Sequence, residues 1–412
     1  MAVGDSPNHE SFYMDMQISF EWLKKFIEIF NNFVKSPGMK YKLEIVASPQ
    51  SRKAFVHFPF ALYKGNAFWV PPLLSDELKS IDPGKNPAFA FCEAQFWLLK
   101  ENNKIVGRVG AIINHDYNKS KGIKYGRFTR FECVDSQDIA NLLLETAENW
   151  CKEKGMDTIH GPLGFTNLDL QGMLIEGFDQ IASIASVYHM PYYRELVENY
   201  GFIKENDWLE FRLTVGEQAI QKANRGAELV QKRYGIEVLH FNKQKELIPY
   251  GPFIFDILND AFDVLPYVTS FSKEMIDFYS AKYMSFLNPR FVKIAIYQNE
   301  PIGFLIGMPG LSQAMQKANG RLFPFGIFAI MQARKGKTDA MDQMLTGVRK
   351  EYQNTGAAVL LMSEIQKEMA KHSIGFIETT GIFETNEKAI SNWKNYEHIQ
   401  HKRRRCFVKK IL

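Results

Sequence analysis

The order of elements predicted for the first half of the chain recurs in the second half, and this repeat limits the fold more than any single motif does. Each half contains a hairpin with an Asn-containing turn, and Gly107 and Gly303, which follow the two turns, lie 196 residues apart. Gly155 and Gly356, which we expect to end the corresponding helices, lie 201 residues apart. A period of this length indicates a duplicated domain rather than a solenoid of short repeats. Two domains also suit a chain of 412 residues, which exceeds one ordinary core.

The hydrophobic pattern of the first half predicts a mixed α/β unit. The expected elements are a strand at 41–46, a helix at 51–63, a hairpin of 95–99 with 105–114, a strand at 127–134, a further helix, and a strand at 157–160. Asp135 is expected to cap the second helix and Gly155 to end it.

The second half repeats this order. The expected elements are a strand at 236–241, helices at 247–263 and 273–286, a hairpin of 291–297 with 302–308, a strand at 325–331, a further helix, and a strand at 357–362. Thr338 is expected to cap that last helix and Gly356 to end it.

The predicted boundaries divide the chain into three parts. Residues 1–38 form an extension, 39–215 the first domain and 216–412 the second, with a helix at 216–234 as the join. Residues 15–35 carry apolar side chains mostly three and four positions apart, which predicts an amphipathic helix in the extension. Such a helix can pack on its own domain, or it can contact a membrane surface or a partner.

The charge balance argues against a nucleic-acid-binding protein. The formal net charge is only +4, although basic residues gather near the C-terminus. They are Lys402, Arg403, Arg404, Arg405, Lys409 and Lys410. We expect a solvated edge strand here, and a contact with phosphate or an anionic membrane is the alternative.

The cysteines and the apolar segments point to the cytoplasm. The four cysteines form no C-x-x-C pair and no histidine lies at metal-ligand spacing from them, so we expect free thiols and no metal site. No run of 18 or more apolar residues is present, and the N-terminal residues lack the apolar region of a signal peptide. The predicted location is cytoplasmic, with a peripheral position at the inner membrane surface left open.

A basic loop in the second half is the first candidate for a phosphate-binding site. It lies between a predicted strand and a predicted helix N-terminus, where backbone N–H groups and the helix dipole favour an anion. Its candidate binding residues are Gln332, Arg334, Lys335, Gly336, Lys337 and Thr338. A plain basic turn capped by Thr338 is the competing interpretation.

The most distinctive segment follows the predicted strand at 157–160. Residues 161–179 read Gly-Pro-Leu-Gly-Phe-Thr-Asn-Leu-Asp-Leu-Gln-Gly-Met-Leu-Ile-Glu-Gly-Phe-Asp, and His-Met-Pro-Tyr-Tyr follows at 189–193. A glycine-rich loop directly after a strand is where an α/β sheet commonly presents ligand-binding residues.

This segment and the order of elements resemble a bacterial group of tandem GNAT-like N-acyltransferases that includes bacterial ceramide synthases. The shared pattern is GP…GxLIxGFD…PYY…LxExxGF, with further matches at 71–73, 86–87, 106–108, 207–211 and 384–386. The resemblance covers about residues 39–412. It implies an α/β (α+β) fold of two tandem GNAT-like domains, each a mixed, mostly antiparallel sheet flanked by helices. It also implies acyl transfer from acyl-CoA to an amine, which for ceramide synthases is a long-chain amine.

The resemblance also bears on the coenzyme. The loop after the fourth strand of a GNAT domain holds the pyrophosphate of coenzyme A and has the pattern Q/R-x-x-G-x-G/A. Set on Gly336, this pattern places Ala333 first and Thr338 last, so only one glycine matches. The corresponding loop of the first domain, residues 133–138, has no glycine and two acids, and should repel a pyrophosphate. We expect the second domain to bind acyl-CoA as a cosubstrate, with no tightly bound cofactor.

Acyl transfer to an amine needs a base for the ammonium proton and donors for the oxyanion. The candidates for acid–base work are Asp169, His189, Tyr192 and Tyr193. Asp169 is the one acid that the resemblance carries over, because 168–170 read Leu-Asp-Leu where ceramide-synthase-like members have Asn-Asp-Glu. Each candidate also has a structural interpretation: a turn for Asp169, a satisfied loop residue for His189, and aromatic packing for the tyrosines.

Three hypotheses follow from these observations. The first is an N-acyltransferase with acyl-CoA or an acyl carrier protein as donor and an amine as acceptor. The second is a catalytically degenerate GNAT-like protein that binds a ligand or a partner without turnover. The third is a peripheral membrane protein held on lipid by its N-terminal helix and basic C-terminus, which is compatible with the first if the amine is a lipid.

Overall fold

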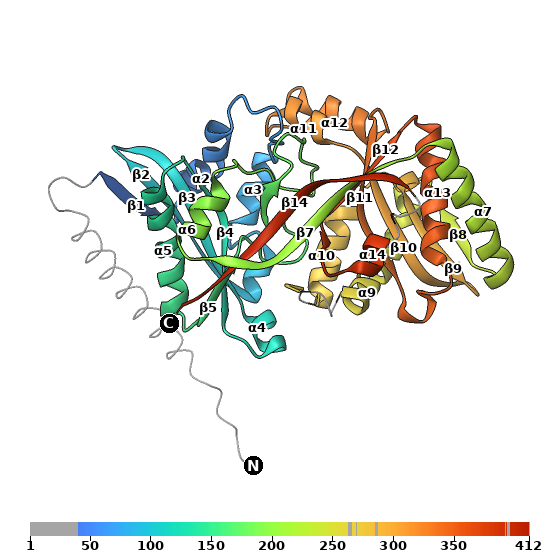
Figure 1. The fold of residues 1–412 in the computed structure, drawn as a ribbon, viewed down its shortest axis with the longest axis horizontal. Helices are drawn as coiled ribbons and strands as arrows, with labels where there is room; N and C mark the ends of the chain where they lie inside the picture. Colours follow the sequence, from blue (N-terminus) through green and yellow to red (C-terminus); the bar gives the residue numbers. More distant parts are fainter. Residues whose placement is uncertain are drawn as a thin grey trace, which may run out of the picture.

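The computed structural model describes residues 40–262, 266–268, 270–284, 287–391, 393 and 396–411. The amphipathic helix predicted at 15–35 lies outside these residues. Within them the chain forms one mixed sheet with helices packed on it, in two halves that lie side by side (Figure 1). The predicted α/β class is therefore confirmed, although the sheets of the two halves are joined rather than separate.

The sheet contains fourteen strands. They are β1 (Tyr41–Ile45), β2 (Cys92–Glu101), β3 (Lys104–Asn114), β4 (Tyr125–Cys133), β5 (Thr158–Gly161), β6 (Met173–Glu176), β7 (Ile203–Thr214), β8 (Glu237–His240), β9 (Val292–Tyr297), β10 (Glu300–Pro309), β11 (Ala340–Val348), β12 (Phe376–Thr379), β13 (Ile382–Phe383) and β14 (Glu397–Lys410). Their main order is β1-β2-β3-β4-β5-β14-β7-β12-β11-β10-β9-β8. Each half contributes one parallel pair, β4 with β5 and β11 with β12.

The helices cover both faces of this sheet. They are α2 (Pro49–Leu62), α3 (Leu74–Ser80), α4 (His115–Lys121), α5 (Gln137–Glu153), α6 (Tyr193–Asn199), α7 (Glu217–Tyr234), α8 (Gln244–Leu247), α9 (Gly251–Phe262), α10 (Lys273–Met284), α11 (Ser312–Ala318), α12 (Gly326–Arg334), α13 (Ala357–Lys371) and α14 (Glu387–Ser391). α5 and α13 bury their apolar sides in two separate cores, one for each half. In the described part of the chain, no helix is both long and apolar enough to cross a membrane.

The two hairpins that reveal the repeat are confirmed. Asn102 and Asn103 join β2 to β3 with φ angles of 48° and 65°, and Gln298 and Asn299 join β9 to β10 with 51° and 66°. Two consecutive residues with positive φ form a tight turn whose backbone twist matches the twist of the two strands that it joins. The helix predicted at 216–234 is also confirmed, as α7.

The last strand of the chain lies at the centre of the sheet. β14 pairs with β5 on one side and with β7 on the other, and β7 in turn pairs with β12 of the second half (Figure 1). The solvated edge strand predicted for residues 402–410 is therefore wrong. Lys402, Arg403, Arg404 and Arg405 can lie in a central strand because Asp207 and Glu210 of β7 face them, while Lys409 pairs with Glu148 of α5 and Lys410 is exposed.

The elements predicted for the middle of the second half are also wrong, and the error has one cause. Residues 310–339 contain two helices, α11 and α12, where the first half has only α4. The predicted strand at 325–331 is therefore α12, the predicted helix after Thr338 is β11, and the predicted strand at 357–362 begins α13. Short apolar runs suit a buried helix and a buried strand equally, so periodicity alone could not separate them.

Candidate functional site

The loop between β11 and α13 has the sequence pattern of a pyrophosphate-binding loop. Gln353-Asn-Thr-Gly-Ala-Ala358 fits Q-x-x-G-x-A at every fixed position. Gly356 is the N-cap of α13 with a φ of +86°, and no side chain caps this helix. The first N–H groups of α13 and its dipole are thus available to an anion. The loop follows the fourth strand of the second half, the position at which GNAT domains hold the coenzyme.

Sequence reasoning missed this loop although its signal is present in the sequence. The sequence pattern predicts that Gly356 ends a helix, whereas the structure shows it at the beginning of one. Setting the pattern on Gly356 instead of Gly336 matches three positions rather than one. The first half has only one helix where residues 310–339 contain two. Aligning the halves without this difference therefore assigns the later strands and helices of the second half to the wrong residues.

The basic loop that we predicted for the phosphate lies before β11 instead of after it. Gln332 and Arg334 end α12, and Lys335, Gly336, Lys337 and Thr338 lead into β11. The Arg334 Nη2 donates hydrogen bonds to Gln244 Oε1 at 3.0 Å and to the Leu287 carbonyl at 2.8 Å. Because no helix begins after this loop, the structural basis for assigning it to the coenzyme is lost.

β11 and β12 separate toward the newly identified loop. They pair in parallel from Ala340 with Phe376 to Gln343 with Thr379, and β11 then continues to Val348 without β12. A β-bulge in the pairing with β10 leaves the residue after Gln343 without an opposite partner. The backbone of this separated segment offers N–H donors for a carbonyl oxygen that gains negative charge.

A cavity of about 60 Å³ lies beside the paired part of β11 and β12. Asp342 of β11 and Glu378 of β12 line it, and the two residues are register partners. The other lining residues come from both halves of the chain and are Ile181, Ser183, Gly310, Ser312, Gln313, Thr338, Asp339 and Ala340. A small cavity lined by three acids, Asp339, Asp342 and Glu378, suits the ammonium group of an amine.

The carboxyl groups of Asp342 and Glu378, which are register partners, have different surroundings. Burial alone would raise the pKa of Glu378, but His401 Nε2 at 2.8 Å and Arg212 Nε at 2.6 Å lower it. Asp342 is only 2% exposed, and its Oδ2 has no hydrogen-bond partner among the described residues. Burial, and then the charge of Glu378, raise the pKa of Asp342 to about 7. Asp342 can therefore take up and release a proton near neutral pH.

The equivalent region of the first half is closed by its own side chains. The Cys133 carbonyl at the end of β4 accepts hydrogen bonds from the Tyr192 hydroxyl at 2.8 Å and the Tyr193 hydroxyl at 3.0 Å. The Cys133 N–H donates to the Tyr193 hydroxyl at 2.9 Å. The N-cap of α5 is Ser136 rather than the predicted Asp135, which leaves an acid in the loop. α5 also begins without a side-chain cap, but the two acids at 133–138 disfavour a pyrophosphate there.

The remaining predicted acid–base residues also make structural contacts. His189 Nδ1 accepts a hydrogen bond from the Leu174 N–H at 3.1 Å, and burial lowers the pKa of this histidine to about 3. Its ring packs edge-on against Tyr193 at 5.7 Å. Asp169 Oδ2 accepts from the Thr166 N–H at 2.9 Å and so holds a turn. The structure brings the histidine and the two tyrosines together, and these contacts match the structural interpretation of each residue.

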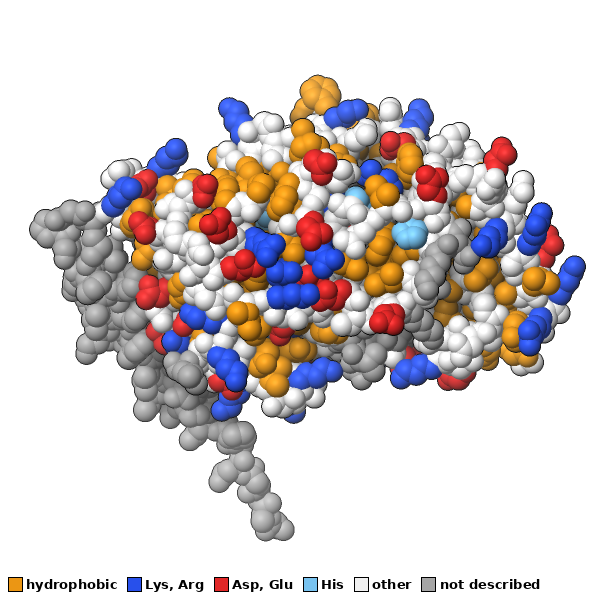
Figure 2. All heavy atoms as spheres, in the orientation of Figure 1, with side chains coloured by type: hydrophobic (Ala, Val, Ile, Leu, Met, Phe, Trp, Pro, Cys, Tyr) orange, Lys and Arg blue, Asp and Glu red, His pale blue; other side chains and the backbone are white. Residues whose placement is uncertain are grey.

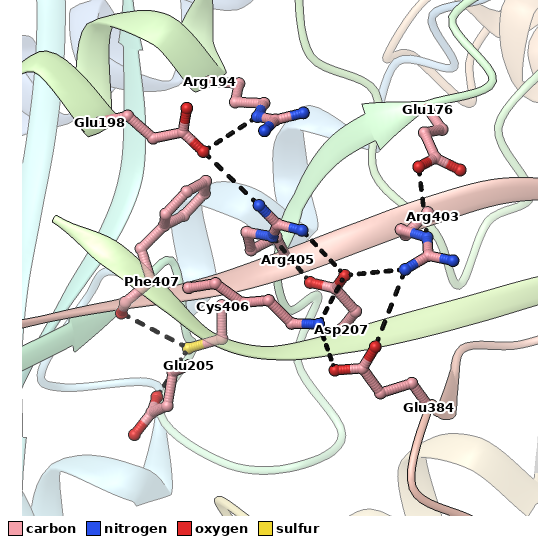
Figure 3. Close-up of polar contacts among 11 residues, drawn as sticks. Glu176, Arg194, Glu198, Glu205, Asp207, Glu384, Arg403, Arg405, Cys406 and Phe407 are labelled. Carbon is pink, nitrogen blue, oxygen red and sulfur yellow. Dashed lines mark hydrogen bonds and ion pairs between the residues drawn. The ribbon is translucent and has the colours of Figure 1, made fainter.

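The basic residues of β14 meet acids inside the sheet (Figure 3). Arg405 donates to both carboxylate oxygens of Asp207, at 2.8 and 3.0 Å, and Arg403 donates to the same group at 3.1 Å. Lys402 lies 3.7 Å from Glu210. These three cations of the basic cluster are thus paired with acids within the protein.

Three residues that could ligate a metal meet where β14 lies between β5 and β7. His160, Glu205 and Cys406 offer ligand atoms within 4.8 Å of one another. Glu205 Oε2 accepts from the Tyr267 hydroxyl at 2.8 Å and lies 3.2 Å from both His160 Nδ1 and Cys406 Sγ. Burial lowers the pKa of His160 and raises that of the Cys406 thiol, which stays protonated. These contacts form a hydrogen-bonded junction between the two halves.

Comparison with known proteins agrees with this architecture. No family model matches the chain. It is 27% identical over 372 residues to Protein YghO of Escherichia coli strain K12, covering 87% of this chain and 93% of that protein. It is 22% identical over 377 residues to the bacterial ceramide synthase of Caulobacter vibrioides, covering 89% and 96%. A solved tandem GNAT protein from the clavulanic acid biosynthesis pathway superimposes with a TM-score of 0.52 at 12% identity, covering 90% and 99%.

These relations confirm the predicted resemblance to tandem GNAT-like acyltransferases. The chain has the tandem GNAT fold over most of its length, and one of its relatives is named as a ceramide synthase. Together they support an acyltransferase as the general class.

Proposed function

We propose that this protein is an N-acyltransferase that transfers an acyl group from acyl-CoA to an amine, with the second half of the chain carrying the reaction. The observation that supports this most strongly is one continuous arrangement. β11 bears Asp342, separates from β12, and leads through Gln353–Ala358 into the uncapped N-terminus of α13. A thioester held at this loop would extend along the strand that carries the candidate base.

The donor is assigned to the second half because its loop fits Q-x-x-G-x-A at every fixed position, whereas residues 133–138 of the first half contain two acids and no glycine. The N-terminus of α13, which begins after Gly356 without a side-chain cap, can bind a pyrophosphate, and the exposed Lys350 adds positive charge nearby in the chain. The first half supplies residues Ile181 and Ser183 to the acceptor cavity instead. The second half would then bind the coenzyme, and both halves would line the cavity for the acceptor.

The proposed chemistry uses Asp342 as the general base. Its carboxylate takes a proton from the ammonium group, and the freed amine nitrogen attacks the thioester carbonyl to form the C–N bond. Backbone N–H groups of the separated part of β11 stabilise the oxyanion. The C–S bond then breaks, and the coenzyme thiolate leaves with the second proton of the amine. Glu378 remains ionised beside its partners, and burial together with the charge of Glu378 keeps the pKa of Asp342 near neutrality.

The acceptor class is suggested by the relatives and by the cavity. The cavity is large enough only for a small group, so we assign it to the amine end of the acceptor. The name of the Caulobacter relative suggests a long-chain lipid amine as the rest of that molecule.

Thermal unfolding with free CoA, acetyl-CoA and palmitoyl-CoA tests the donor assignment. A ligand at about 100 times its Kd stabilises a protein by about 2.7 kcal/mol. Substituting Gly336 or Gly356 is unsuitable, because an added Cβ would lie 2.6 Å from His372 Nδ1 or 2.5 Å from Val230 Cγ2. Ala358→Glu instead places a carboxylate in the first turn of α13, and Ala370→Glu places the same group near the other end as a control.

We expect CoA compounds to stabilise the wild type and Ala370→Glu, but not Ala358→Glu. Product formation from palmitoyl-CoA and a long-chain alkylamine should be lost in Asp342→Asn. Binding of CoA without any turnover would favour the degenerate ligand-binding alternative. No stabilisation by any CoA compound would exclude acyl-CoA as the donor and leave an acyl carrier protein.

A further inference from the structure

The helix pair inserted between β10 and β11 carries a concentrated exposed apolar surface. Phe323 and Phe325 precede α12 and are 75% and 79% exposed, while Phe328 and Met331 on α12 are 64% and 48% exposed. We call these four residues the α12 apolar surface. The other exposed large hydrophobic residues of the described chain are spread over other elements, among them Ile203, Leu229, Ile248 and Ile399. Single exposed residues are ordinary, whereas four within nine positions mark an interaction site.

Basic residues flank this surface. The exposed cations at the end of α11 are Lys317 and Arg321, and those after α12 are Lys335 and Lys337. Asp339 is the nearby exposed acid. In Figure 2, hydrophobic side chains project at the top of the molecule, above α11 and α12, with Lys and Arg side chains on both sides. An apolar centre with a cationic border is complementary to a bilayer with anionic headgroups.

The insertion is fixed to the first half of the chain. Gln316 Nε2 donates hydrogen bonds to the Ala67 carbonyl at 2.8 Å and the Trp69 carbonyl at 3.1 Å, and the Leu74 N–H donates to the Gly320 carbonyl at 3.0 Å. The opposite side of α12 is buried through residues such as Ile330. The apolar residues therefore face outward from an anchored helix pair, so their exposure does not come from a loose loop.

We propose that the α12 apolar surface docks the protein on a lipid bilayer that contains anionic phospholipids. The phenylalanines enter the boundary between headgroups and acyl chains, and the four cations contact phosphate groups. A second copy of the chain is disfavoured as the partner, because the same surface on both copies would bring their cations together. The insertion also lines the acceptor cavity through Ser312 and Gln313 at the start of α11. Its use in delivering a lipid amine to that cavity rests on the proposed function, whereas the docking does not.

Sedimentation of the full chain with vesicles tests this inference. Phosphatidylcholine vesicles with and without phosphatidylglycerol are compared for the wild type and two triple variants. One variant carries Phe323→Ser, Phe325→Ser and Phe328→Ser, and the control carries Ile203→Ser, Leu229→Ser and Ile399→Ser, which are equally apolar and exposed elsewhere. Equal thermal unfolding of the variants shows that each is folded. No coenzyme or amine is needed, so the result is independent of the test of the proposed function.

We expect the wild type and the control variant to bind the anionic vesicles, and the first variant to bind at least tenfold more weakly. Lys335→Glu with Lys337→Glu should remove the preference for anionic vesicles. Full binding by the first variant would place the contact elsewhere, such as in residues 1–38, and overturn the proposal. A wild-type dimer in solution that the first variant abolishes would overturn it as well, because the surface would then join two copies.

Discussion

Replacing Asp342 by Asn should stop acyl transfer and stabilise the folded protein at alkaline pH. The pKa of Asp342 is about 7 in the folded chain and 3.8 in the ordinary case, because burial and the charge of Glu378 disfavour the carboxylate. The stability that the protonated form provides is complete below about pH 4 and is lost as the pH rises through 7. A difference of about three pKa units corresponds to about 4 kcal/mol, which is the upper limit of the loss above pH 8. Asn carries no charge and avoids this loss.

Urea unfolding at pH 5, 7 and 9 measures the effect. The free energy of unfolding of the wild type should fall by about 3 kcal/mol between pH 5 and pH 9 relative to Asp342→Asn, because part of the total loss has already occurred by pH 5. Glu378→Gln is the matched control on the neighbouring strand and should have the opposite sign. It removes the partner of Arg212 and His401, so it should destabilise the protein at neutral pH. The reasoning is refuted if Asp342→Asn follows the wild type at every pH, because the pKa of Asp342 would then not be raised and its carboxylate would be too weak a base for the proposed role.

Three further predictions concern the helix that begins at the proposed coenzyme loop, the central ion pairs and the first half. Ala358→Glu should raise the free energy of unfolding of the free protein by about 0.5 kcal/mol, and Ala370→Glu should lower it by a similar amount. The reason is that the helix dipole favours an anion only at the N-terminus. Urea unfolding measures both changes, and equal shifts would contradict this. Asp207→Ala leaves two arginines of β14 without their carboxylate and should cost about 3–5 kcal/mol. Burial acts to raise the pKa of Asp207, but its arginine partners lower it. The wild type should therefore lose this stability only as the pH falls through the acid range. The free energy of unfolding of the variant should show no such decrease. Tyr193→Phe should cost about 1–3 kcal/mol through the lost hydrogen bonds to Cys133 and leave kcat unchanged, whereas a loss of kcat in the folded variant would restore the predicted catalytic role.

The sequence predicted the repeat and the fold class because these depend on local signals. Asn-containing turns fixed both hairpins, and the helix at 216–234 showed a clear apolar periodicity. These features need only neighbouring residues to form, so they can be seen without knowledge of distant contacts.

The site was harder to predict because it depends on long-range pairing. Asp342 was placed on a predicted helix, where nothing would have set it beside Glu378. The pairing of β14 with β7 brings arginines to Asp207 from almost 200 positions away, and this neutralises a segment that looks like a free basic tail in sequence. The phosphate pattern itself was visible at Gln353–Ala358, but it had meaning only after the structure showed which strand precedes it.

Hydrogen–deuterium exchange with and without CoA tests the central claim most directly, because it locates the coenzyme on the chain. We predict that CoA slows exchange in peptides covering the loop at 349–356 and the first turn of α13, and leaves 133–138 unchanged. Slower exchange at 133–138, or at 332–338 alone, would place the coenzyme elsewhere and contradict the assignment of the second-half loop.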